Sequence, residues 1–195
     1  MLALLFFLPS SVHALPAPGT IRPEGHIYRR PWWERELAPF PPEATTPPTE
    51  QPYSLGEFDP VEGVLLTNWY FDWGRTYIAM IDATLELGVS VYICEEPGYR
   101  SIAESQLTAA GIDATEINWL DCTLETVWMR DYGPMFTVNE DAVLRIGDAA
   151  YAGRPYDDSF PGQATRWWGE DFYDVPLYME GGNFFSDGNG TCVST

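Results

Sequence analysis

A strand–helix–strand pattern in the middle of the chain is the feature that most constrains its fold. Residues 61–69 are apolar enough to form a strand that is buried on both faces. A helix is predicted over residues 74–87, where apolar side chains recur at four-residue spacing, with Asp72 as its cap and Gly88 at its end. Residues 89–93 are rich in β-branched side chains and predict a second strand. Two strands joined by a helix in this way form a right-handed parallel βαβ unit, so the chain is predicted to be an α/β protein.

The same pattern continues towards the C-terminus. Ser101 and Glu104 have the spacing of a capping box, which predicts a helix that ends at Gly111. A strand over residues 115–120 is predicted to follow it. Two β-hairpins are also predicted, because polar or Gly-rich turns separate β-rich segments. They join residues 135–138 to 143–146 and residues 183–185 to 191–193.

Residues 1–14 have the character of a secretory signal peptide. Residues 1–8 form an unbroken apolar run, and Val12 and Ala14 occupy the −3 and −1 positions of a candidate cleavage site. The run is too short to span a bilayer. We therefore expect a secreted or periplasmic protein without a membrane-spanning segment. The alternative is that the apolar run forms a buried N-terminal strand.

A proline-rich stretch follows the predicted signal. Seven prolines lie between residues 31 and 52. Because proline lacks an N–H donor and has a fixed φ, such a stretch favours extended chain and loop over packed elements. We predict that residues 15–57 are a linker and that residues 58–195 are the folded domain.

The charge balance excludes one class of partner. The chain has 29 acidic residues and 10 basic ones, all of them Arg, and its formal net charge is −19. Binding to phosphates requires a basic surface, so a nucleic-acid partner is excluded. The acidity is compatible with a cationic ligand, and also with an acidic surface that only keeps the protein soluble.

Cysteine and histidine residues are few and widely spaced. Cys94, Cys122 and Cys192 contain no C-x-x-C pair, which argues against a zinc site, and the sequence leaves their disulfide status open. Cys192 falls in a predicted hairpin strand and is expected to be a small buried residue. The two histidines, His13 and His26, lie near the N-terminus, outside the predicted core.

One cluster of residues suited to recognition occupies residues 128–134, with the sequence Trp-Met-Arg-Asp-Tyr-Gly-Pro, between two predicted strands. A carboxylate beside an aromatic ring suits a planar cation, because its two oxygens accept parallel N–H bonds while the ring stacks on the cation. The alternative is that Arg130 and Asp131 pair with other protein groups and that Trp128 belongs to the core.

A second cluster, Glu-Gly-Gly-Asn at residues 180–183, precedes the turn at residues 187–191. Gly181 and Gly182 allow the backbone to pass close to another strand or to a ligand. Residues 189–191 also match an N-glycosylation motif, although a tight turn is the more economical explanation.

Together and in this order, the two clusters resemble the W-x-R-D-x-G-P and Glu-Gly-Gly-Asn blocks of the agmatine deiminase and bacterial peptidylarginine deiminase family. The resemblance extends over residues 53–195. It implies the five-bladed α/β propeller of the guanidino-modifying enzymes, of which this chain would form about two ββαβ-type blades. The chain would then be the N-terminal portion of such an enzyme.

The resemblance also implies an activity, which is hydrolysis of a guanidinium to a ureido group with release of ammonia. It implies a Cys thiolate as nucleophile, a His as acid and base, and neither cofactor nor metal. Carried onto this sequence, it assigns Asp131 to the guanidinium as a catalytic residue. It assigns substrate-binding positions to Trp128, Arg130, Arg154, Glu180 and Asn183. Among these, Trp128 would line the pocket, Glu180 would lie near the His, and Arg154 would hold a substrate carboxylate. The alternative for Arg154 is an ion pair with Asp157 or Asp158.

No residue of this sequence matches the expected catalytic Cys and His. We therefore expect the chain to be inactive as it stands and the natural gene to continue beyond Thr195. The signal, the linker and Arg154 favour arginine in peptides as the substrate. An agmatine deiminase of putrescine biosynthesis is the first alternative. The second is a non-catalytic secreted protein that binds cations or carbohydrate through aromatic residues such as Trp167 and Trp168.

Overall fold

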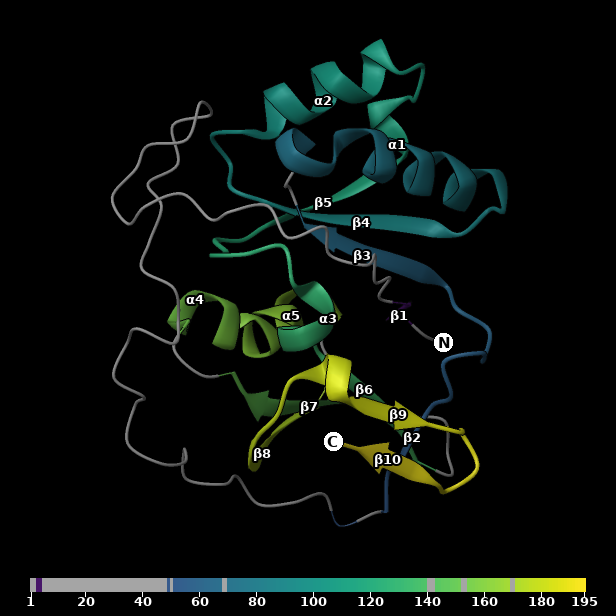
Figure 1. Cartoon of the computed structure of the whole chain (residues 1–195), viewed down its shortest axis with the longest axis vertical. Coiled ribbons are helices and arrows are strands. Elements are labelled where there is room, and N and C mark those ends of the chain that lie inside the picture. Colours follow the sequence, from purple (N-terminus) through teal and green to yellow (C-terminus); the bar gives the residue numbers. More distant parts are fainter. Residues whose placement is uncertain are drawn as a thin grey trace.

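Two four-stranded sheets organise the fold in the computed structural model (Figure 1). The structure describes residues 3–4, 49, 51–67, 70–139, 143–151, 154–168 and 171–195. Most of the predicted signal and linker, including both histidines, lies outside these residues.

The first sheet contains the predicted βαβ unit and is entirely parallel. Its strands, in spatial order, are β1 (Ala3–Leu4), β3 (Gly63–Thr67), β4 (Ser90–Glu95) and β5 (Ile117–Asp121). The helices α1 (Tyr70–Glu86) and α2 (Arg100–Ala109) cover one side of it (Figure 1). Alternate strand residues such as Val64, Val91 and Ile93 face these helices and form a core with Ile81 and Leu107. The α/β prediction is confirmed, and Gly88 ends α1 with a φ of +71° as predicted.

The helix starts differ from the prediction. α1 begins at Tyr70, so Asp72 lies within its first turn instead of capping it. The capping box predicted at Ser101 is wrong, because α2 begins directly after Tyr99 and has no side-chain cap. A backbone turn in which the Tyr99 N–H donates to the Glu96 carbonyl (2.9 Å) leads straight into the helix. A side-chain cap occurs instead at Asp113, which precedes η2 (Ala114–Glu116) and whose carboxylate accepts the Thr115 N–H (2.9 Å). Because η2 occupies these residues, β5 begins two residues later than predicted.

The N-terminal strand β1 pairs with β3, Ala3 opposite Gly63 and Leu4 opposite Val64. This pairing corresponds to the alternative for the apolar N-terminus, whereas cleavage of a signal stays a prediction. No helix among the described residues combines the length and hydropathy needed to cross a bilayer.

The second sheet is mixed. Its strands, in spatial order, are β2 (Tyr53–Ser54), β6 (Met135–Val138), β7 (Leu144–Ala150) and β8 (Asp171–Tyr178). The predicted β6–β7 hairpin is confirmed, since the two strands are antiparallel, and β8 runs parallel to β7. β2 lies in the stretch predicted to be linker, so the folded part includes these residues as well.

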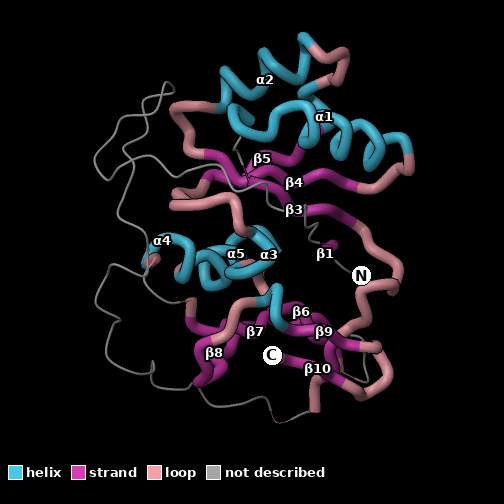
Figure 2. The backbone as a smooth tube through the Cα atoms, viewed as in Figure 1, coloured by secondary structure: helices cyan, strands magenta, loops and turns pink. Residues whose placement is uncertain are grey.

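Three helices lie between the two sheets (Figure 2). They are α3 (Met129–Tyr132), α4 (Pro155–Asp158) and α5 (Phe160–Trp168). A second core forms between these helices and the opposite face of the first sheet, from Leu65, Cys94, Leu120, Cys122, Met129, Tyr132, Tyr151 and Phe160. Trp167 and Trp168 pack against this core, and the Trp168 ring also contacts the rings of Tyr92 and Phe136.

The last elements form the predicted second hairpin. β9 (Phe184–Ser186) and β10 (Cys192–Ser194) are antiparallel, with Gly188 and Gly190 at positive φ in the turn between them. The expectation that Cys192 is buried is wrong. β10 pairs with β9 alone among the described strands, so its residues are exposed. All three cysteines are free, and Cys94 and Cys122 are buried.

Candidate functional site

The first recognition cluster folds into α3, a single helical turn that leads into β6. The Gly133 N–H closes it by donating to the Met129 carbonyl (2.8 Å), and Pro134 ends it because proline restricts the residue before it to extended backbone. Met129 and Tyr132, three residues apart, are buried in the second core. Arg130 and Asp131 therefore lie on the less buried side of the turn.

A buried carboxylate holds the loop that carries α3. Asp157 is fully buried and accepts the backbone N–H groups of Glu125 (2.6 Å) and Thr126 (3.3 Å) and the Thr126 hydroxyl (2.7 Å). The Tyr132 hydroxyl donates to the Thr126 carbonyl (2.7 Å). Burial raises the pKa of Asp157 to about 6 against the opposing effect of these hydrogen bonds. The sequence analysis named Asp157 only as an alternative partner of Arg154 and missed this role.

The second recognition cluster lies directly against α3. Its Gly pair begins η3 (Gly181–Asn183), and a Cβ added at Gly181 would lie 2.3 Å from the Arg130 carbonyl oxygen. No side chain fits there, so the predicted close approach is confirmed and its partner is the backbone of α3. The Gly182 N–H donates to the Asp131 carboxylate. Two segments about fifty residues apart in sequence are thus in backbone contact.

This contact brings two acidic side chains together. Burial raises the pKa of Asp131 to about 6, and the negative charge of Glu180 adds to the rise. The Gly182 N–H and the charges of Arg130 and Arg154 oppose it. Burial and the charge of Glu180 therefore outweigh the two arginines and the Gly182 N–H.

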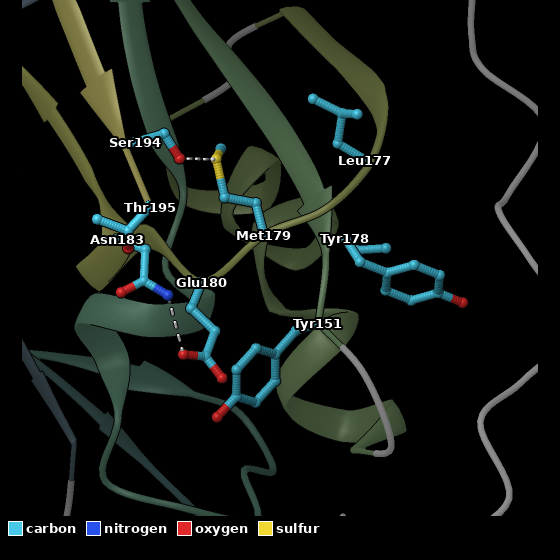
Figure 3. Close-up of a pocket in the computed structure, with 9 residues that line it drawn as sticks. Tyr151, Leu177, Tyr178, Met179, Glu180, Asn183, Ser194 and Thr195 are labelled. Atoms are coloured by element: carbon cyan, nitrogen blue, oxygen red, sulfur yellow. Dashed lines mark hydrogen bonds between the residues drawn. The ribbon is translucent and has the colours of Figure 1, made fainter.

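Glu180 also lines a pocket of about 420 Å³ (Figure 3). The other lining residues are Ala150, Tyr151, Leu177, Tyr178, Met179, Asn183, Ser194 and Thr195. The Asn183 side-chain amide donates to the Glu180 carboxylate (3.5 Å), and the Tyr151 ring lies close to that carboxylate (Figure 3). Burial raises the pKa of the Tyr151 hydroxyl, so this residue is a neutral hydrogen-bonding group.

Of the six residues assigned by resemblance, only Glu180 and Asn183 line this pocket. Trp128 is partly buried against the second core and does not line the pocket. The Arg130 guanidinium forms an ion pair with Glu57, with Nη1 3.1 Å from the carboxylate, and donates to the Phe184 carbonyl (3.3 Å). Arg130 is therefore engaged with protein groups, as the alternative proposed, and joins three segments of the chain.

Arg154 lies near Asp131 without forming an ion pair to its predicted alternative partners. Its charge acts on Asp131, Tyr151 and Asp157. Among the described residues it forms no ion pair with Asp157 or Asp158, and its buried Nη1 has no hydrogen-bond partner. Asp158 instead accepts the Tyr151 N–H. An unused cationic donor thus lies close to the acidic pair.

The described residues can hold a cation but do not place a nucleophile beside it. Cys94 and Cys122 lie in the second core and Cys192 lies exposed on β10. Within the described ranges no group of His, Cys, Asp and Glu side chains is suited to a metal ion. The site therefore consists of paired carboxylates, a tyrosine, an asparagine and a nearby arginine.

Fold and site together define an α/β domain with two acids gathered beside a pocket. Comparison with known proteins gives the family. The sequence model of the Porphyromonas-type peptidyl-arginine deiminases matches residues 65–195, and the chain belongs to this family. The resemblance stated from the two clusters is thereby confirmed.

Relatives and solved structures agree with this assignment. The chain is 32% identical over 90 residues to a Photobacterium profundum protein named "Putative agmatine deiminase", covering 40% of this chain and 25% of the relative. It is 29% identical over 174 residues to a Vibrio parahaemolyticus protein of the same name, covering 78% and 46%. The chain thus spans less than half the length of these relatives.

The fold resembles that of the agmatine deiminase of Enterococcus faecalis. The TM-score is 0.63 at 20% identity, over 73% of this chain and 43% of that structure. This likeness concerns the fold alone, and it supports the mixed α/β architecture. The five-bladed arrangement stays a prediction.

Proposed function

We propose that the whole protein is a deiminase that hydrolyses a guanidino group to a ureido group with release of ammonia, and that this chain supplies acids that hold the guanidinium. The observation that carries the proposal is the backbone contact between α3 and η3, which places Asp131 beside Glu180. Family membership supports the reaction class.

The electrostatics of the pair suit a cationic substrate. Burial raises the pKa of Asp131, and repulsion between its carboxylate and that of nearby Glu180 adds to the rise. A guanidinium relieves this repulsion and donates several N–H groups in a plane, so it forms charge-assisted hydrogen bonds that water cannot match in strength. The cation then lowers the pKa of Asp131. The nucleophilic Cys and the His implied by the resemblance belong, in this proposal, to parts of the protein beyond these residues.

Binding by the chain itself tests the acidic site. Agmatine and a dipeptide ending in arginine are titrated into the chain at pH 8, with binding followed by NMR shifts of the Gly182 and Asn183 amides. We expect saturable shifts at both amides with at least one of the two compounds. An uncharged ureido analogue of each compound is the control. Equal shifts with the analogue, or none with either cation, would contradict the proposal.

Within this reaction we propose peptidyl arginine with a free carboxylate as the substrate. The unpartnered Nη1 of Arg154 near the acidic pair supports it, because a substrate carboxylate would complete its hydrogen bonds. Agmatine, which has no carboxylate, is the second candidate, favoured by the names of the relatives. A secreted or periplasmic location remains part of this proposal and rests on residues 1–14.

Three ligands separate the two substrates in the full-length protein: a dipeptide ending in arginine, its C-terminal amide, and agmatine. If Arg154 binds the carboxylate, kcat/KM for the dipeptide should exceed that for the amide by about one to two orders of magnitude, and Arg154→Ala should abolish the difference. Equal rates on dipeptide and amide would make agmatine-like amines the preferred substrates.

A further inference from the structure

The segment that precedes β3 is bound to the second sheet and to the C-terminal hairpin. We call residues 53–59 the strap. Its strand β2 pairs with β6, Tyr53 opposite Val138, and the Ser54 carbonyl accepts the Ser186 hydroxyl of β9 (3.0 Å). Gly56 is buried, and a Cβ there would lie 3.2 Å from the backbone of the β9–β10 turn. The strap therefore contacts both the second sheet and the C-terminal hairpin (Figure 1).

One ion pair connects the strap to the candidate site. Glu57 in the strap forms an ion pair with Arg130, through both terminal nitrogens, Nη1 and Nη2, of the guanidinium. The Arg130 side chain is only 13% exposed, whereas that of Glu57 is 41% exposed. Arg130 also donates to the Phe184 carbonyl (3.3 Å) and lies over the Phe185 ring, 5.9 Å from its centre. A single guanidinium thus joins the strap, α3 and β9.

These contacts surround the junction that brings the two acids together. Phe184 directly follows η3, and the Arg130 carbonyl lies against Gly181. Asp131 is the next residue after Arg130 and accepts the Gly182 N–H. Arg130 belongs to α3. Its side chain therefore holds β9, and with it η3, against the backbone of α3.

We propose that Glu57 is a positioning residue that orients the Arg130 guanidinium and thereby fixes η3 against α3, which sets the separation of Asp131 and Glu180. The functional importance of this inference rests on the proposed function, in which Asp131 and Glu180 hold the guanidinium. The positioning of η3 against α3 by Glu57 is a structural claim that holds whether or not a ligand binds.

Positioning and simple charge make different predictions for Glu57→Gln. Removing a negative charge, acting through space alone, lowers the pKa of nearby Asp131 and leaves the protection of the Gly182 amide unchanged. Releasing Arg130 loosens η3 and weakens the hydrogen bond from the Gly182 N–H to the Asp131 carboxylate. Exchange of the Gly182 amide with solvent therefore separates the two roles.

The test uses the full chain without ligand, with Glu57→Gln compared to Glu62→Gln. Glu62 is an exposed acid just beyond the strap, so its variant matches the change in net charge. We expect the Gly182 amide to exchange with solvent at least about tenfold faster in Glu57→Gln than in the wild type, with exchange in β4 unchanged. Glu62→Gln should match the wild type in this measurement.

Unchanged Gly182 exchange in Glu57→Gln would overturn the proposal. Faster exchange throughout β4 would mean general unfolding, and Glu57→Asp then decides, since it retains the charge on a shorter side chain. We expect Glu57→Asp to fold and to give intermediate Gly182 exchange, and wild-type exchange in that variant would also overturn the proposal.

Binding measurements with the two ligands separate this inference from the proposed function. Where the wild type binds agmatine or the arginine dipeptide, Glu57→Gln should weaken that binding at pH 8 by about threefold or more, and unchanged affinity would contradict the positioning role. If the wild type binds neither compound, the proposed function fails, while the exchange experiment still decides the role of Glu57.

Discussion

At the scale of residues, the site contains two carboxylates, Asp131 and Asp157, whose pKa is raised mainly by burial and whose protein partners differ. Asp131 has a protein N–H donor and an acidic neighbour, and it lies next to the pocket acid Glu180. Asp157 is buried deeper but has three donors from the loop it holds. Asp131 can therefore still bind a cationic ligand, whereas the hydrogen bonds of Asp157 are already made by protein groups.

Asp131→Asn should therefore remove guanidinium binding while preserving the fold. The amide has the same shape but loses the charge-assisted contact, which is worth about 2–4 kcal/mol at a desolvated site. In the full-length protein kcat/KM, measured by ammonia release, should fall at least about a hundredfold. Asp121→Asn, at an exposed acid outside the site, is the control. Activity within about threefold of the wild type would remove Asp131 from the site.

Asp148 on β7 gives a prediction about stability. Burial, with smaller contributions from Asp158 and Asp174, raises its pKa to about 7, and its buried Oδ1 has no hydrogen-bond partner among the described residues. Because the folded pKa lies above the unfolded value of 3.8, the folded state binds the extra proton, and the stability of the chain falls as pH rises from about 4 to 7.

Asp148→Asn should remove this loss. We expect the variant to unfold in urea with a free energy about 1–2 kcal/mol higher than the wild type at pH 8, and with no difference near pH 4. The gain should grow between about pH 4 and pH 8, through the folded pKa of Asp148, and be constant at higher pH. A variant that is less stable than the wild type at pH 8 would refute the account of Asp148.

How far a residue's role could be predicted depends on how local its contacts are. Asp131 and Glu180 were singled out because each lies in a compact motif. The roles of Glu57 and Asp157 were missed because their partners, Arg130 and Glu125, are 73 and 32 residues away in the sequence. No periodicity or spacing rule connects residues at such distances.

At the scale of elements, local patterns predicted the regular units and failed where tertiary contacts decide. The βαβ unit and both hairpins follow from periodicity and turn residues. β8 was not predicted, because Pro176 interrupts it. The ladder with β7 accommodates this proline by an irregularity in register, since Ala149 pairs with Val175 and Ala150 with Tyr178.

The contact between α3 and η3 gives the prediction for this scale. Gly181→Ala places a methyl group within 2.3 Å of the Arg130 carbonyl oxygen, so the two elements must separate. We expect the free energy of unfolding to fall by about 1–3 kcal/mol and guanidinium binding to be lost. Gly98→Ala is the matched control, because nothing lies within 4 Å of its added Cβ and its φ is not positive. Equal behaviour of the two variants would show that η3 does not depend on this contact.

At the scale of the whole molecule, two sheets with three helices between them form the architecture (Figure 2). The α/β class could be predicted because each βαβ unit is local. The division of strands between two sheets could not, because β2 joins β6 across more than eighty residues and its two residues carry no strand pattern. The family could be predicted because its two motifs are specific, although each occupies only a few residues.

For the chain as a whole we expect binding without turnover. The described residues place carboxylates, but neither Cys nor His, beside the pocket. Incubation of the chain with agmatine or the arginine dipeptide should release no ammonia above the background of the compounds alone, under conditions where NMR detects binding. Ammonia release that Asp131→Asn abolishes would show that the chain carries its own nucleophile.

The strap also has a consequence for the order in which the chain folds. Its hydrogen bond from Ser186 to Ser54 closes a loop of 132 residues, and its ion pair to Arg130 closes one of 73. Closing long loops loses entropy before any contact compensates for it, so such contacts form late. The other strands of the two sheets should therefore assemble first, and the strap, with its strand β2, should dock last. Weakening the strap should then accelerate unfolding while leaving the refolding rate nearly unchanged, which makes it a determinant of the lifetime of the folded state.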